Sequence, residues 1–366
     1  MALMRVLIAP QEFKGSLSAD EAAAAISKGV RLVRPEWRRD ILPMSDGGPG
    51  LIDAVRHAVR AESFAAVVRD PLGSRVLARY IQVGPSGYVV IEAALANGLW
   101  HLLPDRLDAL NASTEGVGDL LLDAATIEPS RIIVGVGGSA TTDGGSGMAR
   151  AMGARFEDAA GHELPPGGSA LRGLASIAWT RPAALDGIEL MVATDVTNPL
   201  LGPNGAAAVY GPQKGASSEQ VAILEEGLTR FATVVKRDLR VDVRDLPGGG
   251  AAGGLAAGLV AFLCARIVSG FEMVAELTRL HERLAAADLV ITGEGRFDSQ
   301  SLQGKVTGRI VEMARATGKQ VVVFAGSAMV ALEGAEIREL PADRPMSEAA
   351  AALTETVQAW AGEART

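Results

Sequence analysis

Short, uninterrupted aliphatic runs that lead into glycine and charged residues recur along the chain, and they constrain its fold more than any other feature. The runs end at Ile8, Val134, Ala193, Ile291 and Phe324. Continuous aliphatic runs are typical of strands that are covered on both faces, as in parallel sheets. Between them lie helical patterns, such as a capping box at residues 18–21 followed by Ile26, Val30 and Val33 at helical spacing. Alternating strands and helices predict an α/β fold.

Composition narrows the class of protein. The chain has 366 residues, which is enough for two domains, and its formal charge of −8 argues against a dedicated nucleic-acid binder. The lone Cys264 excludes a disulfide framework and a cysteine zinc site, and therefore favours a reducing compartment. No export or membrane segment is apparent, because the longest uncharged stretch, 246–265, opens with Pro-Gly-Gly-Gly. We therefore expect a soluble, cytoplasmic protein.

The 43 glycines are clustered, and three clusters form Gly-Gly loops. Residues 45–50 and 142–147 share the pattern Ser/Thr-Asp-Gly-Gly-x-Gly, and residues 247–254 precede an apolar helix. Adjacent glycines let backbone N–H groups point at an anion, and a following helix start adds a favourable dipole. In open α/β sheets ligands bind outside the carboxyl ends of the strands, where these loops are expected. The pattern predicts phosphate handling, with tight turns or close packing as the alternative.

Two familiar phosphate motifs do not fit. Residues 304–307 resemble the end of a Walker loop, but no glycine stands five positions earlier and Val306 replaces Ser or Thr. Residues 135–140 satisfy the dinucleotide pattern G-x-G-x-x-A, yet the Thr-Thr-Asp-Gly-Gly run that follows would break the first turns of the required helix. A nicotinamide-dependent oxidoreductase stays a remote alternative.

Phosphoryl transfer without a Walker loop needs cations for the phosphate, carboxylates for Mg²⁺ and an acceptor for the hydroxyl proton. Cations in or beside glycine-containing loops are Lys14, Lys214, Arg296 and Lys305. Loop carboxylates are Asp46, Asp143, Asp195, Glu294 and Asp298. Asp195 and Glu294 are the stronger candidates, since each directly follows a predicted buried strand. For a single charged loop residue, a solvated charge or a helix cap is the competing interpretation.

These motifs, taken together, resemble the bacterial glycerate kinase family of the glycerate 2-kinase type. The resemblance runs in order along nearly the whole chain. Its blocks are residues 13–19, 46–48, 70–73, 90–93, 137–145, 195–202 and 211–215, then 291–296 with Asp298, Gln300, Gly304 and Lys305. The resemblance implies an enzyme that phosphorylates D-glycerate with ATP and Mg²⁺, and only the resemblance suggests the 2-hydroxyl as the acceptor. The small-molecule substrates would be its partners, without nucleic acid or membrane, and the sequence leaves the oligomeric state open.

For the fold, the resemblance implies two α/β domains with largely parallel sheets and an active-site cleft between them. We expect residues 1–69 with 285–366 to form a Rossmann-like domain, and residues 70–284 to be inserted as the second domain.

For the site, the resemblance leads to a mechanistic hypothesis. ATP phosphates would lie on the loop 137–145, and Lys14 and Arg296 would hold the glycerate carboxylate or the γ-phosphate. Asp195 and Glu294 would organise Mg²⁺ or accept the hydroxyl proton, and Asp298 would be a third carboxylate. Of these three, Asp195 and Asp298 are the expected metal ligands. The expected binding residues are Gly137, Gly138, Ser139, Thr141, Asp143, Gly144, Asp46, Gly47, Asn198, Lys214 and Lys305.

The chain departs from the family pattern at several positions. Gln11 replaces the family's aspartate, and Pro49 stands where a glutamate is usual. Glu12, next to Gln11, is a possible substitute, although adjacent residues of an extended segment point in opposite directions. Two alternatives therefore stay open: a kinase for a different small hydroxy acid, and a catalytically weak homologue that binds a ligand.

Overall fold

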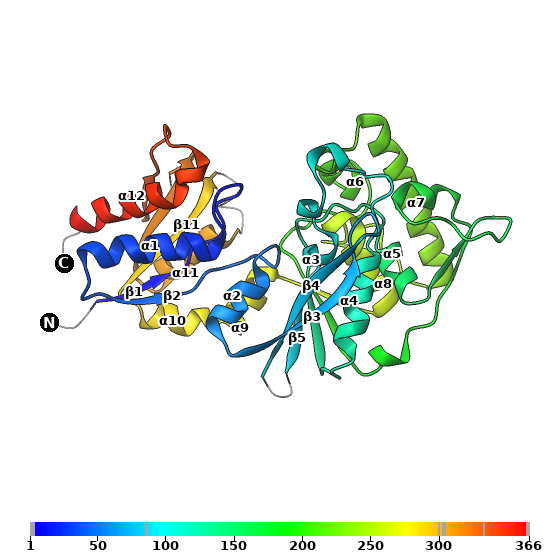
Figure 1. Cartoon of the computed structure of the whole chain (residues 1–366), viewed down its shortest axis with the longest axis horizontal. Coiled ribbons are helices and arrows are strands. Elements are labelled where there is room, and N and C mark those ends of the chain that lie inside the picture. Colours follow the sequence, from blue (N-terminus) through cyan, green and yellow to red (C-terminus); the bar gives the residue numbers. More distant parts are fainter. Residues whose placement is uncertain (1–3, 85–86, 299–300, 302–304, 332–333, 364–366) are drawn as a thin grey trace. The chain divides into compact units, whose positions relative to one another are not determined.

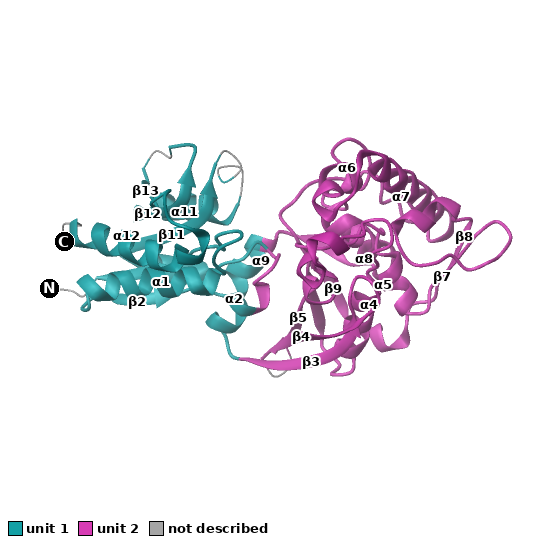
Figure 2. Cartoon of the chain, turned by 45° about the horizontal axis from the view of Figure 1, so that its top comes forward, with its two compact units in different colours: residues 1–46, 53–60, 271–366 teal, residues 47–52, 61–270 magenta. Residues whose placement is uncertain are grey.

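The computed structural model describes residues 4–84, 87–298, 301, 305–331 and 334–363. The chain divides into two compact units, which Figure 2 distinguishes by colour: residues 1–46, 53–60 and 271–366, and residues 47–52 and 61–270. Both units combine helices with a mostly parallel sheet, as predicted. The domain limits that we expected, 69/70 and 284/285, differ from this division: residues 47–52 and 61–69 fall in the second unit, and residues 271–284 fall in the first.

The first unit is built on a five-stranded parallel sheet, in the order β13-β12-β11-β1-β2. Its strands are β1 (Arg5–Ile8), β2 (Arg38–Ile41), β11 (Leu289–Phe297), β12 (Gln320–Ala328) and β13 (Glu336–Glu339). The central strands β1 and β11 pair in the register Ile8 to Ile291. Their aliphatic residues are buried because helices cover the sheet (Figure 1), which is the property that the continuous runs indicated.

Helix α1 (Ala19–Val33) begins at the predicted capping box. The hydroxyl of Ser18 accepts a hydrogen bond from Glu21 N, and the Glu21 carboxylate accepts one from Ser18 N, so two orphan donors are satisfied. The α1 helix packs against α12 (Ala349–Glu363) at Gly29, where a Cβ atom would lie 2.7 Å from Thr354 O. The unit's other α-helices are α2 (Leu51–Ala58), α9 (Gly270–Leu277), α10 (Leu280–Ala286) and α11 (Val306–Ala316), the first residues of α2 and α9 falling in the second unit.

The second unit has a six-stranded sheet in the order β10-β9-β6-β5-β4-β3. The strands are β3 (Ala61–Arg69), β4 (Arg75–Val83), β5 (Tyr88–Glu92), β6 (Arg131–Gly135), β9 (Glu189–Ala193) and β10 (Arg266–Val268). Strands β5, β6, β9 and β10 are parallel, whereas β3 and β4 add an antiparallel ribbon at one edge. Strands β7 (Arg155–Glu157) and β8 (Ser176–Ala178) form a separate antiparallel pair.

The helices of the second unit share one large core with this sheet. They are α3 (Ala94–Asn97), α4 (Glu115–Ala125), α5 (Ser146–Ala151), α6 (Ala206–Tyr210), α7 (Ser218–Asp238) and α8 (Leu255–Leu263). The apolar stretch that follows the third glycine loop forms α8, whose residues are almost all buried in this core. None of the described helices is both long and apolar enough to cross a membrane.

Candidate functional site

In the first unit, the candidate residues lie at the carboxyl edge of the parallel sheet, as expected. Lys14 follows β1, Asp46 follows β2, and Glu294 with Arg296 lies at the end of β11. The sequence predicted a loop after Ile291, but the strand continues to Phe297. Two glycines allow this extension: a Cβ at Gly293 would lie 2.3 Å from Phe324 O, and one at Gly295 would lie 3.0 Å from Lys14 N.

Glu294 is the most buried carboxylate among these first-unit candidates, with 6% of its surface exposed. Burial raises its pKa, while the hydroxyls of Ser301 and Thr307 and the charge of Lys305 oppose the increase. Its Oε1 atom has no hydrogen-bond partner among the described residues. A carboxylate in this setting is a stronger base than one in water.

The cations of the first unit differ in exposure. Lys14 and Arg296 are exposed, and Arg296 Nε lies 3.4 Å from Asp298 Oδ2. Lys305 is half-buried and occupies the N-cap position of α11. Gln300 and Gly304, two residues of the same family block, lie outside the described residues. This edge therefore combines cations that can bind an anion with a buried base.

Gln11 and Glu12 follow β1, where the family pattern differs. Gln11 N donates to Gly293 O at 2.9 Å, and the side chain of Gln11 is buried, whereas Glu12 is only partly buried. Burial raises the pKa of Glu12; the charge of Lys14 opposes this increase and the charge of Asp46 adds to it. A carboxylate is thus present near Lys14 and Asp46, although one position later than in the family pattern.

In the second unit, Asp195 and Asn198 lie in the loop after β9. The hydroxyl of Ser269, just after β10, donates a hydrogen bond of 2.6 Å to Asp195 Oδ1. Asn198 Oδ1 accepts a hydrogen bond of 2.7 Å from the Tyr210 hydroxyl, and its Nδ2 donates to Asn204 O at 2.8 Å. Both candidate side chains are therefore held in fixed orientations by residues of the same unit.

The glycine loop after β6 packs on the glycines that follow Asp46. A Cβ at Gly137 would lie 2.9 Å from Gly48 Cα, and one at Gly138 would lie 2.8 Å from the Pro49 side chain. Gly47 has a φ of +89°, and its Cβ would lie 2.9 Å from Ala193 O, so only glycine fits there. The loops after Asp46 and after β6 are thus in contact, and Gly138 is exposed at their surface.

The second half of this loop, residues 141–144, packs against the third glycine loop and is not available to a ligand. Gly144 N donates to Gly253 O at 3.1 Å, and a Cβ at Gly253 would lie only 2.0 Å from Thr141 O. Close packing, which was the alternative interpretation of the Gly-Gly pairs, therefore accounts for the contact between the second and third glycine loops. In this loop Gly138 is exposed and Gly137 is half-buried, so an anion can approach the loop at these two glycines.

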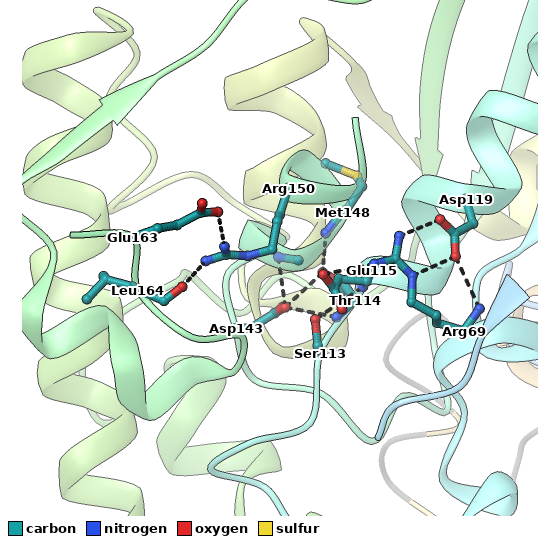
Figure 3. A network of polar contacts seen from close by, with 11 residues as sticks. Arg69, Ser113, Thr114, Glu115, Asp119, Asp143, Met148, Arg150, Glu163 and Leu164 are labelled. Atoms are coloured by element: carbon teal, nitrogen blue, oxygen red, sulfur yellow. Dashed lines mark hydrogen bonds and ion pairs between the residues drawn. The ribbon is translucent and has the colours of Figure 1, made fainter. Parts of the chain in front are cut away.

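Asp143 is fully buried and is the centre of a polar network in Figure 3. Its carboxylate accepts hydrogen bonds of 2.9 Å from the backbone N and the hydroxyl of Thr114, and of 3.1 Å from Gly145 N and Gly147 N. Burial raises its pKa, and the four hydrogen bonds act in the opposite direction. The carboxylate thereby joins the start of α4 to the start of α5, which is the helix-capping role that competed with ligand binding.

Lys214 is buried in the same unit, with 2% of its surface exposed. Its Nζ donates to Thr141 O at 2.5 Å and to the Ser139 hydroxyl at 3.3 Å. Burial lowers the pKa of Lys214 to about 7, and the charge of Asp143 opposes this shift. The amine is therefore placed against the glycine loop, where it fixes the backbone at Thr141.

Sequence reasoning missed several polar residues that support these candidates. Thr114 and Thr307 are isolated hydroxyl residues, and nothing in their sequence context distinguishes them from other serines and threonines. Glu92, which lies in one of the weaker family blocks, is buried at the end of β5 and accepts a hydrogen bond of 3.5 Å from Ile52 N. The signal that could have found Ser269 and Glu92 is their place at the carboxyl ends of β10 and β5.

Comparisons with known proteins cover almost the whole chain. The sequence profile of the glycerate kinase family matches residues 6–363. The glycerate kinase of Halalkalibacterium halodurans is 44% identical, and the glycerate 2-kinase of Escherichia coli is 43% identical; each alignment covers 88% of this chain and 85% of the relative. A solved structure named for glycerate kinase 2 of Salmonella typhimurium LT2 superimposes with a TM-score of 0.83 at 41% identity, covering 99% of this chain and 98% of that one.

Proposed function

Because the chain belongs to the glycerate kinase family, we propose that it transfers the γ-phosphoryl group of ATP to D-glycerate. The observation that carries this conclusion is the family match over residues 6–363, together with relatives above 40% identity that are named glycerate kinases. The Escherichia coli relative is named a glycerate 2-kinase, which supports the 2-hydroxyl as acceptor and 2-phosphoglycerate as product.

The base in this proposal is the buried carboxylate of β11. The oxygen of the 2-hydroxyl forms a bond to the γ-phosphorus while the bond from that phosphorus to the β–γ bridging oxygen breaks, and ADP leaves. Glu294 accepts the proton of the hydroxyl, since burial raises its pKa and its Oε1 is unpartnered among the described residues. Lys14 and Arg296 bind the substrate carboxylate or the transferring phosphate.

The nucleotide-binding loop in this proposal is the glycine loop after β6. Gly137 and Gly138 approach the phosphates with backbone atoms, and the buried Lys214 keeps the Ser139–Thr141 backbone in place. We assign Asp143 to the support of this loop, since its oxygens accept four hydrogen bonds from the protein. Asn198, Asp46, Gly47 and Lys305 stay proposed binding residues.

A carboxylate such as Asp195, which the Ser269 hydroxyl holds in place, is a suitable ligand for Mg²⁺. No group of three or more His, Cys, Asp or Glu side chains with metal-binding geometry occurs among the described residues. In nucleotide sites Mg²⁺ is usually bound through one or two carboxylates together with phosphate oxygens. We propose Asp195 or Asp298 as the protein ligand, and the metal would neutralise charge on the phosphates.

The alternatives have less support. The Gly135 motif does not open a helix, because α5 begins only at Ser146, so a dinucleotide site is disfavoured. Gln11 and Pro49 left open another hydroxy acid or a weak homologue, but neither is supported by the similarity to named glycerate kinases. The cytoplasmic location stays a prediction.

A coupled assay of ADP release, run across D-glycerate, L-glycerate, D-lactate and glycolate, tests the proposal. We expect the highest kcat/KM with D-glycerate and no turnover without Mg²⁺. ADP release only with another acid, or binding without ADP release, would contradict the assignment. A change in nicotinamide absorbance with a nicotinamide cofactor alone, in the absence of ATP and of coupling enzymes, would favour the oxidoreductase instead.

A further inference from the structure

The amide oxygen of Gln11 is a buried hydrogen-bond acceptor without a donor. The residue is 8% exposed, and its Oε1 atom has no hydrogen-bond partner among the described residues. The backbone of Gln11 is fixed, because its N–H donates to Gly293 O at 2.9 Å. The side chain is therefore held at the carboxyl edge of the sheet with its acceptor unsatisfied.

A further unsatisfied polar atom belongs to the same edge. Glu294 Oε1 also has no hydrogen-bond partner among the described residues. The register of β1 and β11, Ile8 to Ile291, continues through the hydrogen bond from Gln11 N to Gly293 O, which places Gln11 alongside Glu294. Thr307 is in the first turn of α11, and its hydroxyl is close enough to Glu294 to lower the pKa of that carboxyl.

Such a cluster is unusual in a folded protein, where buried polar groups are nearly always paired. An unpaired buried acceptor destabilises the protein unless a ligand or water supplies a donor. The amide oxygen of Gln11 and the ionised carboxylate of Glu294 can only accept hydrogen bonds. Their complement is a ligand with two donors on neighbouring atoms, and two hydroxyls on adjacent carbons have this form.

We propose that Gln11 determines specificity by accepting a hydrogen bond from the substrate hydroxyl that is not phosphorylated, while the reacting hydroxyl faces Glu294. This inference rests on the proposed function. It implies that the site prefers a 2,3-dihydroxy acid over an acid that carries only a 2-hydroxyl. D-Glycerate and D-lactate differ at this one group, because D-lactate has a methyl in place of the 3-hydroxymethyl. Both acids carry the 2-hydroxyl that faces Glu294.

The test compares the dissociation constants of D-glycerate and D-lactate, measured by titration calorimetry on the full chain and on Gln11→Met. Methionine has nearly the same shape without the acceptor. We expect the preference for D-glycerate over D-lactate to fall about 10-fold or more, as a site built for a hydroxyl loses its hydrogen bond. Gln358→Met, on the exposed side of α12, is the matched control and leaves the preference unchanged.

A second measurement separates this role from a structural one. Removing an unsatisfied acceptor does not weaken the ligand-free protein, so the urea midpoint of Gln11→Met is expected to equal or exceed that of the parent chain. Gln11→Asn withdraws the oxygen by one bond and is expected to lower the preference as well, which provides a second folded variant.

The inference is overturned if Gln11→Met weakens both acids equally, or if the preference does not change. Neither result affects ADP formation from D-glycerate by the parent chain, which tests the proposed function separately. If the parent chain forms no ADP but the preference still falls in Gln11→Met, the site binds a dihydroxy acid and the kinase proposal is wrong.

Discussion

The hydroxyl of Ser269 donates a hydrogen bond of 2.6 Å to Oδ1 of Asp195 and so joins the ends of two neighbouring parallel strands, β10 and β9. A hydrogen bond to a charged group is stronger than one between neutral groups, and here it fixes the rotamer of the proposed magnesium ligand. Ser269 is therefore a positioning residue in this account.

For Ser269→Ala, we expect kcat/KM to fall about 10- to 100-fold, because one hydrogen bond to a carboxylate contributes about 1.5–3 kcal/mol. Ser269→Thr keeps the hydroxyl and is expected to restore most of the activity. The measurement is steady-state kinetics at several Mg²⁺ concentrations, with the loss larger at low Mg²⁺. When Ser269→Ala is added to Asp195→Asn, we expect little further loss of kcat/KM, because the two residues act through the same hydrogen bond. If the losses of the two single variants add fully, the two residues act separately.

For Glu294→Gln, we expect kcat to fall about 10²- to 10⁴-fold, the usual contribution of a general base. Since burial raises the pKa of Glu294, the activity of the parent enzyme should decline on the acid side at a pH above the usual range of a glutamate. The variant should lack this decline, and a pH–rate profile of both proteins measures it. Glu312→Gln, exposed on α11, serves as the control. An unchanged kcat in Glu294→Gln would exclude Glu294 as the base.

For Asp143→Asn, we expect a loss of stability of about 3 kcal/mol, because an amide cannot accept all four hydrogen bonds that the carboxylate accepts. Urea unfolding measures the change. Asp105→Asn, in the exposed 3₁₀ segment Pro104–Arg106, should stay within about 0.5 kcal/mol of the parent. A stable Asp143→Asn with weakened ATP binding would instead favour direct contact between Asp143 and the nucleotide.

For Gly253→Ala, we expect destabilisation of about 2–4 kcal/mol, because φ is +68° and the new Cβ would lie 2.0 Å from Thr141 O. Gly187→Ala is the matched control: its φ is +76°, but nothing lies within 4 Å of the new Cβ, so only the backbone strain of about 1–2 kcal/mol remains. Equal losses in the two variants would show that the contact between the glycine loops contributes nothing.

For Lys214, we expect a pH dependence of stability. Its pKa of about 7 in the folded chain lies below the ordinary lysine value, so above pH 7 the unfolded chain binds more protons. The free energy of unfolding should therefore rise with pH from about 7 towards 10, by at most about 1.4 kcal/mol per pH unit, and be flat with respect to this group below pH 7. Unfolding of Lys214→Met across the same range should lack this rise, and parallel curves for the two proteins would contradict the burial of a titrating amine.

The α/β architecture was predictable from sequence because continuous aliphatic runs are a direct consequence of burial on both faces of a sheet. The antiparallel β3–β4 ribbon was not predicted, since its residues do not form such a run and its register depends on tertiary pairing. The continuation of β11 to Phe297 was missed for a related reason: glycine usually ends a strand, and only the close approach of Phe324 and Lys14 explains why it does not here.

The glycine loops show where sequence reasoning about a site stops. A Gly-Gly pair indicates that a Cβ cannot be accommodated, and this holds equally for a loop that approaches a phosphate and one that packs on another loop. Gly138 is exposed, whereas Gly253 lies against Thr141, and the sequence around them does not distinguish the two cases. The same limit applies to Asp143, because two of its four donors belong to Thr114, 29 residues earlier in the chain.

A ³¹P NMR time course of the purified protein with ATP, Mg²⁺ and D-glycerate tests phosphoryl transfer to the 2-hydroxyl most directly. We predict that the γ-phosphate signal is lost as one phosphomonoester signal grows, split into a doublet by the single hydrogen on carbon 2. A triplet, from the two hydrogens on carbon 3, would contradict phosphorylation at the 2-hydroxyl. Unchanged ATP signals in the presence of folded protein would contradict the kinase activity itself.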